Sequence, residues 1–322
     1  MLRRLVGTLD FANPTVPWLP RAACATALVS SLSSAAAASG FQCAPDELIP
    51  FALRESFNAG RATKILRFDL PIPTRQAPSG VKVLFDGVDE KLGLPKVLEK
   101  SYSPISLPSA EGYFDILVKK YPPRAGGGVG AFLCSLNPGE VALMRVKAPR
   151  VIHGSEAVAG RWARLGFVAG GTGVAPFLQI IRALLADDAD ETRMRLLFVN
   201  RREEDILARA ELDDLAARFP GRFNVAYSLT QPGDAWGGLV GRGSADMARA
   251  ALSWDETAGA PTTGGGAGAA MVMVCGTDGF VETWSGPLTR VKNADGTKRK
   301  VQGPVLGFLR DAGFTATEVY KF

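Results

Sequence analysis

The chain has 322 residues, 47% apolar and 21% charged, a balance that is ordinary for a globular protein of about two domains. Four cysteines without a CxxC pair exclude a disulfide scaffold and argue against structural zinc, and one histidine argues against a His-rich metal centre and a Ser-His-Asp hydrolase. The net charge of +5, without a dense basic run, is too small to indicate nucleic-acid binding, so we expect no metal site and no nucleic-acid partner.

Residues 1–40 differ in composition from the rest of the chain. They contain three arginines and one acid, and they end in a stretch rich in Ala and Ser. This composition is typical of an organelle transit peptide, which predicts a mitochondrial location. Ala22–Ser39 is uncharged and near the minimum length of a membrane span, so residues 17–40 could instead serve as a membrane anchor. A plain disordered tail is the third alternative.

From residue 45 to 150, short apolar runs are broken by Pro and Gly, which predicts closely spaced strands. Between Thr63 and Leu70, apolar and polar residues alternate with the period of two of a half-buried strand. Such strands favour a small antiparallel β-barrel. Examples of the expected strands are Thr63–Leu70, Val81–Phe85, Tyr113–Tyr121 and Val141–Lys147.

From residue 160 to 322, apolar strands alternate with helical patterns, which predicts an α/β domain with a mostly parallel sheet. Acidic residues in its first turn and one apolar stripe indicate that Glu203–Phe219 is a helix. Residues 257–269 are expected to form a flexible surface loop, and residues 293–303 a solvated basic insertion. The other expected elements are strands Leu165–Ala169, Met194–Val199, Phe223–Leu229 and Met271–Cys275, and helix Val174–Ala186.

The segment from Leu165 to Leu185 is the most informative for function. An apolar strand leads into a Gly-Gly-Thr-Gly turn and then into a helix. Glycine lets the backbone turn sharply and lets a ligand approach, and a helix N-terminus favours a phosphate group. Pro176 suits the first helical turn, where its missing N–H costs no hydrogen bond. The spacing is neither GxGxxG nor a P-loop, so a phosphate-binding turn and an ordinary strand-to-helix turn both stay open.

The segment Lys100–Ser106, KSYSPIS, is the second candidate. It offers an aromatic ring, two hydroxyls and a cation at the end of a barrel strand, and this combination suits a flat polar ring with a phosphate. Ser-Pro also marks ordinary turns, so the segment by itself leaves both readings open.

The order and separation of these two segments resemble those of the ferredoxin-reductase-like flavoproteins, and within them the NADH–cytochrome b5 reductase branch. KSYSPIS is similar to the RxYTPxS flavin motif, Gly170–Pro176 to the GGTGxxP nicotinamide-nucleotide turn, and Val272–Phe280 to the CGPPxM segment. Gly112–Pro123 and Gly126–Leu136 are similar to the strand pair and the glycine-rich turn that lie between them. The resemblance runs from about Phe51 to Phe322.

This resemblance implies a FAD-binding antiparallel barrel over residues 45–150 and an NAD(P)H-binding α/β domain over residues 160–322. It also implies transfer of a hydride from NADH to FAD, and then of single electrons to a haem protein such as cytochrome b5. Ser103, beside flavin N5, and Cys275, beside the nicotinamide, would be the catalytic residues. The residues that would contact a cofactor are Lys100, Tyr102, Ser103, Ser106, Lys119, Tyr121, Gly128, Val129, Gly130, Gly170, Gly171, Thr172, Gly173, Pro176, Cys275, Gly276 and Phe322.

The chain departs from the family pattern at the FAD phosphates. Lys100 replaces an Arg, and Gly128 and Gly130 replace a Lys and a Ser, so several phosphate contacts are lost. These losses favour one alternative function, a non-catalytic subunit of a mitochondrial assembly that has lost FAD. A flavoreductase that acts on small oxidants such as quinones is another alternative.

A second departure concerns the nucleotide. Thr230 stands where NADH-preferring members carry an Asp against the ribose, and Arg201 and Arg202 are expected to lie nearby. Because an acid at this place repels a 2′-phosphate and an Arg accommodates one, NADPH is a possible cofactor besides NADH.

Overall fold

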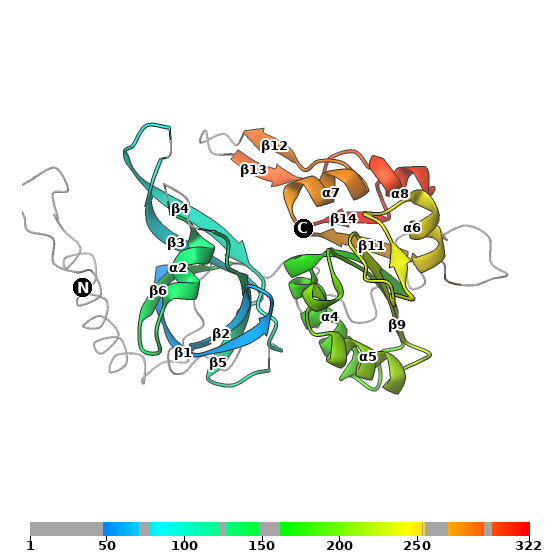
Figure 1. The fold of residues 1–322 in the computed structure, drawn as a ribbon, viewed down its shortest axis with the longest axis horizontal. Helices are drawn as coiled ribbons and strands as arrows, with labels where there is room; N and C mark the ends of the chain where they lie inside the picture. The colour runs from blue at the N-terminus through cyan, green and yellow to red at the C-terminus, as the bar shows by residue number, and fades with distance from the viewer. Residues whose placement is uncertain are drawn as a thin grey trace, which may run out of the picture.

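A computed structural model of the protein shows two six-stranded sheets, one antiparallel and one parallel (Figure 1). The expected transit peptide or anchor at residues 1–40 and the loop at residues 257–269 lie outside the part of the chain that the structure describes. Within that part, no helix has the length and apolar character needed to cross a bilayer. The described residues are 48–70, 77–89, 91–107, 109–122, 127–147, 162–252, 254, 270–292 and 298–322.

The antiparallel sheet closes into the predicted barrel. Its strand order is β4-β3-β6-β1-β2-β5, and the chain beyond β4 reaches β5 through a bridge between Pro104 and Ile116. The Ile105 N–H donates to the Asp115 carbonyl at 2.8 Å, which extends this closure. Helix α2 packs against β3, β4 and β5. The elements are β1 (Leu48–Gly60), β2 (Thr63–Asp69), β3 (Val81–Val88), β4 (Pro95–Tyr102), β5 (Tyr113–Lys119), α2 (Val129–Ser135) and β6 (Val141–Val146).

Strand β1 was not among the named examples of expected strands, and β4 was implied only by the placement of KSYSPIS at the end of a barrel strand. In β1, Leu53 pairs with Phe68 and Glu55 with Arg67, so Arg54 is bulged out of register. The residues from Arg54 to Asn58 are all exposed, which removes the alternation that marks a strand. Strand β3 also continues past the predicted end at Phe85, because its pairing with β4 extends beyond the barrel core.

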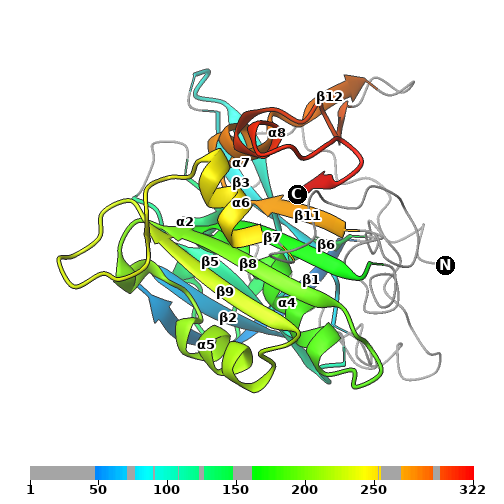
Figure 2. The same ribbon diagram turned by 90° about the vertical axis from the view of Figure 1, so that its right-hand side faces the viewer.

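The parallel sheet has the order β10-β9-β8-β7-β11-β14, and every pair in it is parallel. Helices α4 and α5 cover one face, and α6, α7 and α8 cover the other, as Figures 1 and 2 show. The predicted barrel followed by an α/β domain is therefore confirmed. The elements are β7 (Arg164–Gly170), η3 (Gly171–Val174), α4 (Ala175–Leu185), β8 (Arg193–Asn200), η4 (Glu203–Asp205), α5 (Arg209–Arg218), β9 (Phe223–Leu229), β10 (Leu239–Val240), α6 (Ala245–Leu252), β11 (Ala270–Cys275), α7 (Asp278–Ser285), β12 (Thr289–Lys292), β13 (Lys298–Val301), α8 (Gly307–Asp311) and β14 (Val319–Lys321).

The single helix predicted over Glu203–Phe219 is wrong in its first half. The acidic residues form a separate 3-10 turn, η4, and α5 begins only after Ala208, whose backbone is left-handed with φ of 53°. Ile206 and Leu207 between the two elements are buried in the domain core. Burial of these two side chains requires the chain to leave the helical path, so tertiary packing overrides the local helical signal.

The described end of the predicted solvated insertion at residues 293–303 contains an ordered strand, and its residues from 300 to 303 are exposed or half-buried. Strand β13 pairs with β12 in an antiparallel hairpin, seen at the top of Figure 1. The Gln302 side chain then accepts from the Lys321 N–H at 2.9 Å and donates to the Lys321 carbonyl at 2.8 Å. This part of the segment is therefore attached to the last strand of the sheet.

Helix α4 connects the two domains through polar contacts. The buried Gln179 amide donates to the Ser106 carbonyl at 3.0 Å, and the Arg182 guanidinium donates to the Ile105 carbonyl. Arg182 is held in turn by Glu211 at 2.6 Å. The nucleotide domain thus holds the end of the KSYSPIS segment of the barrel in place.

Candidate functional site

Three adjoining cavities lie between the barrel and the parallel sheet. Their volumes are about 860, 570 and 320 Å³, and we call them the large, middle and small cavity. Tyr121 of the barrel and Thr277 of the α/β domain line all three, so the cavities form one continuous cleft with walls from both domains. Interdomain clefts of this kind are frequent cofactor sites.

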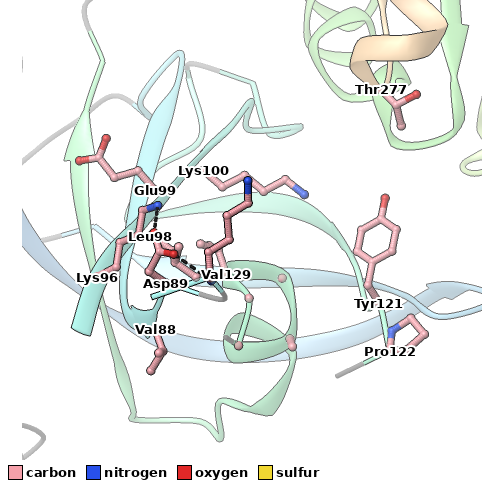
Figure 3. A pocket seen from close by; sticks show the side chains of 15 residues that line it. Val88, Asp89, Lys96, Leu98, Glu99, Lys100, Tyr121, Pro122, Val129 and Thr277 are labelled. Carbon is pink, nitrogen blue, oxygen red and sulfur yellow. Dashed lines mark hydrogen bonds and ion pairs between the residues drawn. The ribbon is translucent and has the colours of Figure 1, made fainter. Parts of the chain in front are cut away.

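The large cavity runs along the barrel, between the β3–β4 hairpin and the glycine-rich turn before α2 (Figure 3). Lys91, Lys96 and Lys100 line it, and Lys96 pairs with Asp89 at 2.7 Å. A Cβ added at Gly128 would meet nothing within 4 Å, so the wall is open there. The excess of cations over acids favours an anionic ligand in this cavity.

Tyr102 ends strand β4 and places its hydroxyl inside the protein. The Oη atom is buried and has no hydrogen-bond partner among the described residues. Burial raises the pKa of Tyr102 well above its usual value, so the hydroxyl stays protonated and can donate a hydrogen bond. An unpaired buried hydroxyl costs about 1–3 kcal/mol, which a ligand with an acceptor at this place would recover.

Lys100 lies between two aromatic rings of the cleft. Its Nζ is 5.5 Å from the centroid of the Tyr102 ring and 5.4 Å from that of the Tyr121 ring. Figure 3 shows the Lys100 side chain extended along the cavity on the side of Tyr121. A single positive charge is therefore held at the point where the large and small cavities meet.

The small cavity brings together predicted residues that lie far apart in the sequence. Tyr102 and Ser103 of the barrel line it together with Gly173, Pro176 and Cys275 of the α/β domain. Both residues predicted to be catalytic therefore face one space of about 320 Å³.

The glycines of the Gly170–Gly173 turn have different structural roles. A Cβ on Gly173 would lie 2.2 Å from the Cys275 carbonyl oxygen, so close packing of two turns requires this glycine. A Cβ on Gly170 would lie 2.8 Å from the Phe280 ring. Gly171 has φ of 52° and nothing within 4 Å of a Cβ, so its backbone is open to the cleft. Both readings of the turn are thus present, packing at Gly170 and Gly173 and ligand access at Gly171.

The middle cavity lies over the carboxyl ends of the parallel strands. Thr172 and Thr230 line it together with Arg201, Asp205 and Arg242. Ligands of open α/β sheets bind at this edge, so the middle cavity suits the rest of a nucleotide whose one end is at the glycine turn.

All the predicted cofactor contacts except Ser106 and Phe322 line at least one of the three cavities. The Ser106 hydroxyl instead accepts from the Asp115 N–H at 3.2 Å, and the Phe322 ring packs against Phe177 with centroids 5.5 Å apart. For both residues, the structure shows a supporting contact in place of a position in the cleft.

Sequence reasoning missed two groups of lining residues. Lys91 and Lys96 lie in the β3–β4 hairpin, beyond Phe85, where the strand predicted from Val81 was expected to end. Arg242 follows the two-residue strand β10, and no motif marks it. Neither group had a local signal, because the residues reach the cleft only through pairing between strands.

The cleft fits the cofactors that the resemblance implied. The unpaired Tyr102 hydroxyl, the Lys100 charge and the open backbone at Gly128 offer a donor, a cation and space to a flavin dinucleotide. The open backbone at Gly171 offers the same space to a nicotinamide dinucleotide.

Comparisons with known proteins agree with this geometry. The family model of the oxidoreductase FAD-binding domain matches residues 50–151, and that of the oxidoreductase NAD-binding domain matches residues 167–285. The NADH-cytochrome b5 reductase 2 of Botryotinia fuckeliana is 30% identical over 269 residues, which are 82% of this chain and 69% of that protein. An NADH-cytochrome b5 reductase-like protein of Arabidopsis thaliana is 32% identical over 284 residues, which are 86% of this chain and 77% of that protein.

Solved structures share the fold. The cytochrome b5 reductase domain of Ulva prolifera nitrate reductase superposes with a TM-score of 0.66 at 23% identity, over 86% of this chain and 98% of that one. A ferredoxin NADP+ reductase from Neisseria gonorrhoeae superposes with a TM-score of 0.58 at 16% identity, over 85% and 98% of the two chains. By its sequence relatives, its two matched domains and its cleft, the chain belongs to the NADH–cytochrome b5 reductase family of FAD- and NAD-binding oxidoreductases.

Proposed function

We propose that this protein takes electrons from NADH and passes them through FAD to a haem protein such as cytochrome b5. The observation that carries the proposal is the small cavity, where Tyr102 and Ser103 of the barrel share one space with Gly173 and Cys275 of the α/β domain. The names of its relatives in Botryotinia fuckeliana and Arabidopsis thaliana support this class of donor and acceptor.

Different residues of the cleft contribute different interactions to cofactor binding. When bound, FAD supplies the exchange between a two-electron donor and a one-electron acceptor. Tyr102 donates a hydrogen bond from a protonated hydroxyl, and Lys100 supplies a positive charge beside the two tyrosine rings. Ser103 offers a second hydroxyl in the small cavity, and Gly171 leaves the backbone open for the nucleotide. Packing of Gly173 on Cys275 fixes the far wall of the small cavity.

The lysines of the cleft also suit an acidic haem protein as acceptor. Lys91, Lys96 and Lys100 line the large cavity, and Lys119 lines the middle and small ones. Complementary charge speeds the encounter of two proteins, and salt screens it. The rate of cytochrome b5 reduction should therefore fall as ionic strength rises, and a rate independent of salt would contradict an electrostatic encounter.

The visible absorption spectrum of the full chain tests the function. The protein would be purified with FAD present and then desalted. We expect the bands of oxidised flavin to be retained, to bleach on addition of NADH, and to return on addition of oxidised cytochrome b5. In Ser103→Ala, retained flavin should bleach more slowly, whereas Ser56→Ala, an exposed serine of β1, should behave as wild type.

The alternatives are separated by the same experiment. A protein that retains no flavin after purification with FAD would favour a non-catalytic subunit, for which the glycines at 128 and 130 already provide a reason. Return of the flavin bands with a small quinone, without any return with cytochrome b5, would favour a quinone-type flavoreductase.

We also propose that residues 1–40 direct the protein to mitochondria, with membrane attachment through residues 17–40 as the alternative. The arginines, the near absence of acids and the Ala/Ser-rich stretch support import. A fluorescent fusion of the full chain should co-localise with mitochondria, and the chain that starts at residue 41 should not. Recovery of the full chain in carbonate-washed membranes would support attachment, and cytosolic fluorescence of the full chain would contradict both.

A further inference from the structure

Three neighbouring strand ends bring two arginines to either side of a threonine. Arg201 follows β8, Thr230 follows β9, and Arg242 follows β10, and these strands are adjacent in the sheet. The Thr230 N–H donates to the Asn200 carbonyl at 3.0 Å, which places the first two strand ends side by side. The Gly241 N–H donates to the Leu229 carbonyl at 2.9 Å, which places the third beside them. All three residues line the middle cavity.

Both guanidinium groups lack an acidic partner among the residues that the structure describes. In the described part of the chain, no carboxylate pairs with Arg201 or Arg242, whereas Arg182 and Arg209 of the same domain both have acidic partners. The Arg201 Nε donates to the neutral Gln231 amide at 2.9 Å, which holds the side chain and leaves its other N–H groups available.

The remaining charges of the middle cavity also favour an anionic ligand. Its lining holds the cations Lys119, Arg201 and Arg242 and one acid, Asp205. A carboxylate oxygen of Asp205 accepts from the Arg202 N–H at 3.2 Å, so this acid is already engaged with the backbone. With three cations against one acid, the lining is net positive and favours an anionic ligand.

The chemistry at such an edge separates two classes of dinucleotide. An acidic side chain there accepts a hydrogen bond from the ribose 2′-hydroxyl and repels a phosphate, whereas arginine accommodates a 2′-phosphate through bidentate, charge-assisted hydrogen bonds. Thr230 carries no charge and accepts either. We infer that the middle cavity binds the 2′-phosphate of NADPH between Arg201 and Arg242, so that NADPH serves as a hydride donor in addition to NADH. This inference rests on the proposed function, which assigns the nicotinamide dinucleotide to this cavity.

Binding of two adenosine fragments to the full chain with FAD tests the inference without turnover. Isothermal titration calorimetry would compare adenosine 2′,5′-bisphosphate with 5′-AMP, which differ only in the 2′-phosphate. We expect the bisphosphate to bind at least about tenfold more tightly, as one charge-assisted contact can provide. Arg242→Ala and, separately, Arg201→Ala should each reduce this preference about tenfold and leave 5′-AMP unchanged. Thr230→Asp should reverse the preference, because the carboxylate repels the phosphate.

Arg218→Ala is the matched control. This exposed arginine lies on α5 of the same domain, pairs with Asp214 and does not line the cavity. It should leave both fragment affinities unchanged. If the wild type binds 5′-AMP measurably but binds the bisphosphate no more tightly, the inference is overturned and the proposed function stands. Binding of neither fragment would instead refute the assignment of the nucleotide to this cavity, and with it the proposed function.

Discussion

The buried hydroxyl of Tyr102 allows protein stability and flavin binding to be separated in one substitution. In the FAD-free protein this hydroxyl is buried without a partner among the described residues, at a cost of about 1–3 kcal/mol. Tyr102→Phe removes the oxygen and keeps the ring, so the FAD-free protein should become more stable by about 1 kcal/mol. This corresponds to a rise in Tm of roughly 2–4 °C for a protein of this size.

The same substitution should weaken FAD binding. A Cβ on Gly130, in the first turn of α2, would lie 3.7 Å from the Tyr102 oxygen, so the hydroxyl is beside the turn where the resemblance places the FAD pyrophosphate. A hydrogen bond to a charged group contributes about 1.5–3 kcal/mol, so the Kd for FAD should rise roughly tenfold or more. Quenching of flavin fluorescence gives the Kd, and thermal unfolding without FAD gives the stability.

Tyr227→Phe is the matched control. The Tyr227 hydroxyl donates to Asp213 at 2.6 Å on the other domain, so its removal should destabilise the protein by about 1 kcal/mol and leave the Kd for FAD unchanged. A Tyr102→Phe protein that melts below the wild type without FAD and keeps an unaltered Kd for FAD would contradict both roles of the hydroxyl.

Four further substitutions test the packing of the two domains. Gly173→Ala should lower the free energy of unfolding by several kcal/mol in a urea titration, because its Cβ would lie 2.2 Å from a carbonyl oxygen. Gly171→Ala should lower it by only about 1–2 kcal/mol, because the only penalty is the left-handed φ. Equal losses of stability in the two variants would contradict the packing role of Gly173. Lys321→Met removes a buried ammonium group that donates to three backbone carbonyls, so it should destabilise the protein by about 2–4 kcal/mol, and an unchanged Tm would argue against this contribution. Gln179→Leu removes the contact with the Ser106 carbonyl, so hydrogen exchange in the KSYSPIS segment should accelerate, and unchanged exchange would show that α4 does not hold this segment.

Sequence patterns predicted most of the fold because those patterns are local. Alternation over residues 63–70 corresponds to strand β2, and the apolar run over 165–169 corresponds to strand β7. The glycine turn and Pro176 correctly predicted the start of α4, although one 3-10 turn precedes it. Where burial by distant partners decides the conformation, as at Ile206 and Leu207, the same local rules predicted a helix that the chain does not form.

The sequence by itself determined the two domain types, the phosphate-suited turn at Gly170–Gly173 and the two segments whose order indicated a flavoprotein, because periodicity, glycine and motif order are properties of neighbouring residues. Only the tertiary structure decided that the Tyr102 hydroxyl is buried without a partner among the described residues, that Gly173 is required by packing, and that Arg242 joins Arg201 across Thr230. Each of these features depends on contacts between segments far apart in the chain, and such contacts leave no periodic signal in the sequence.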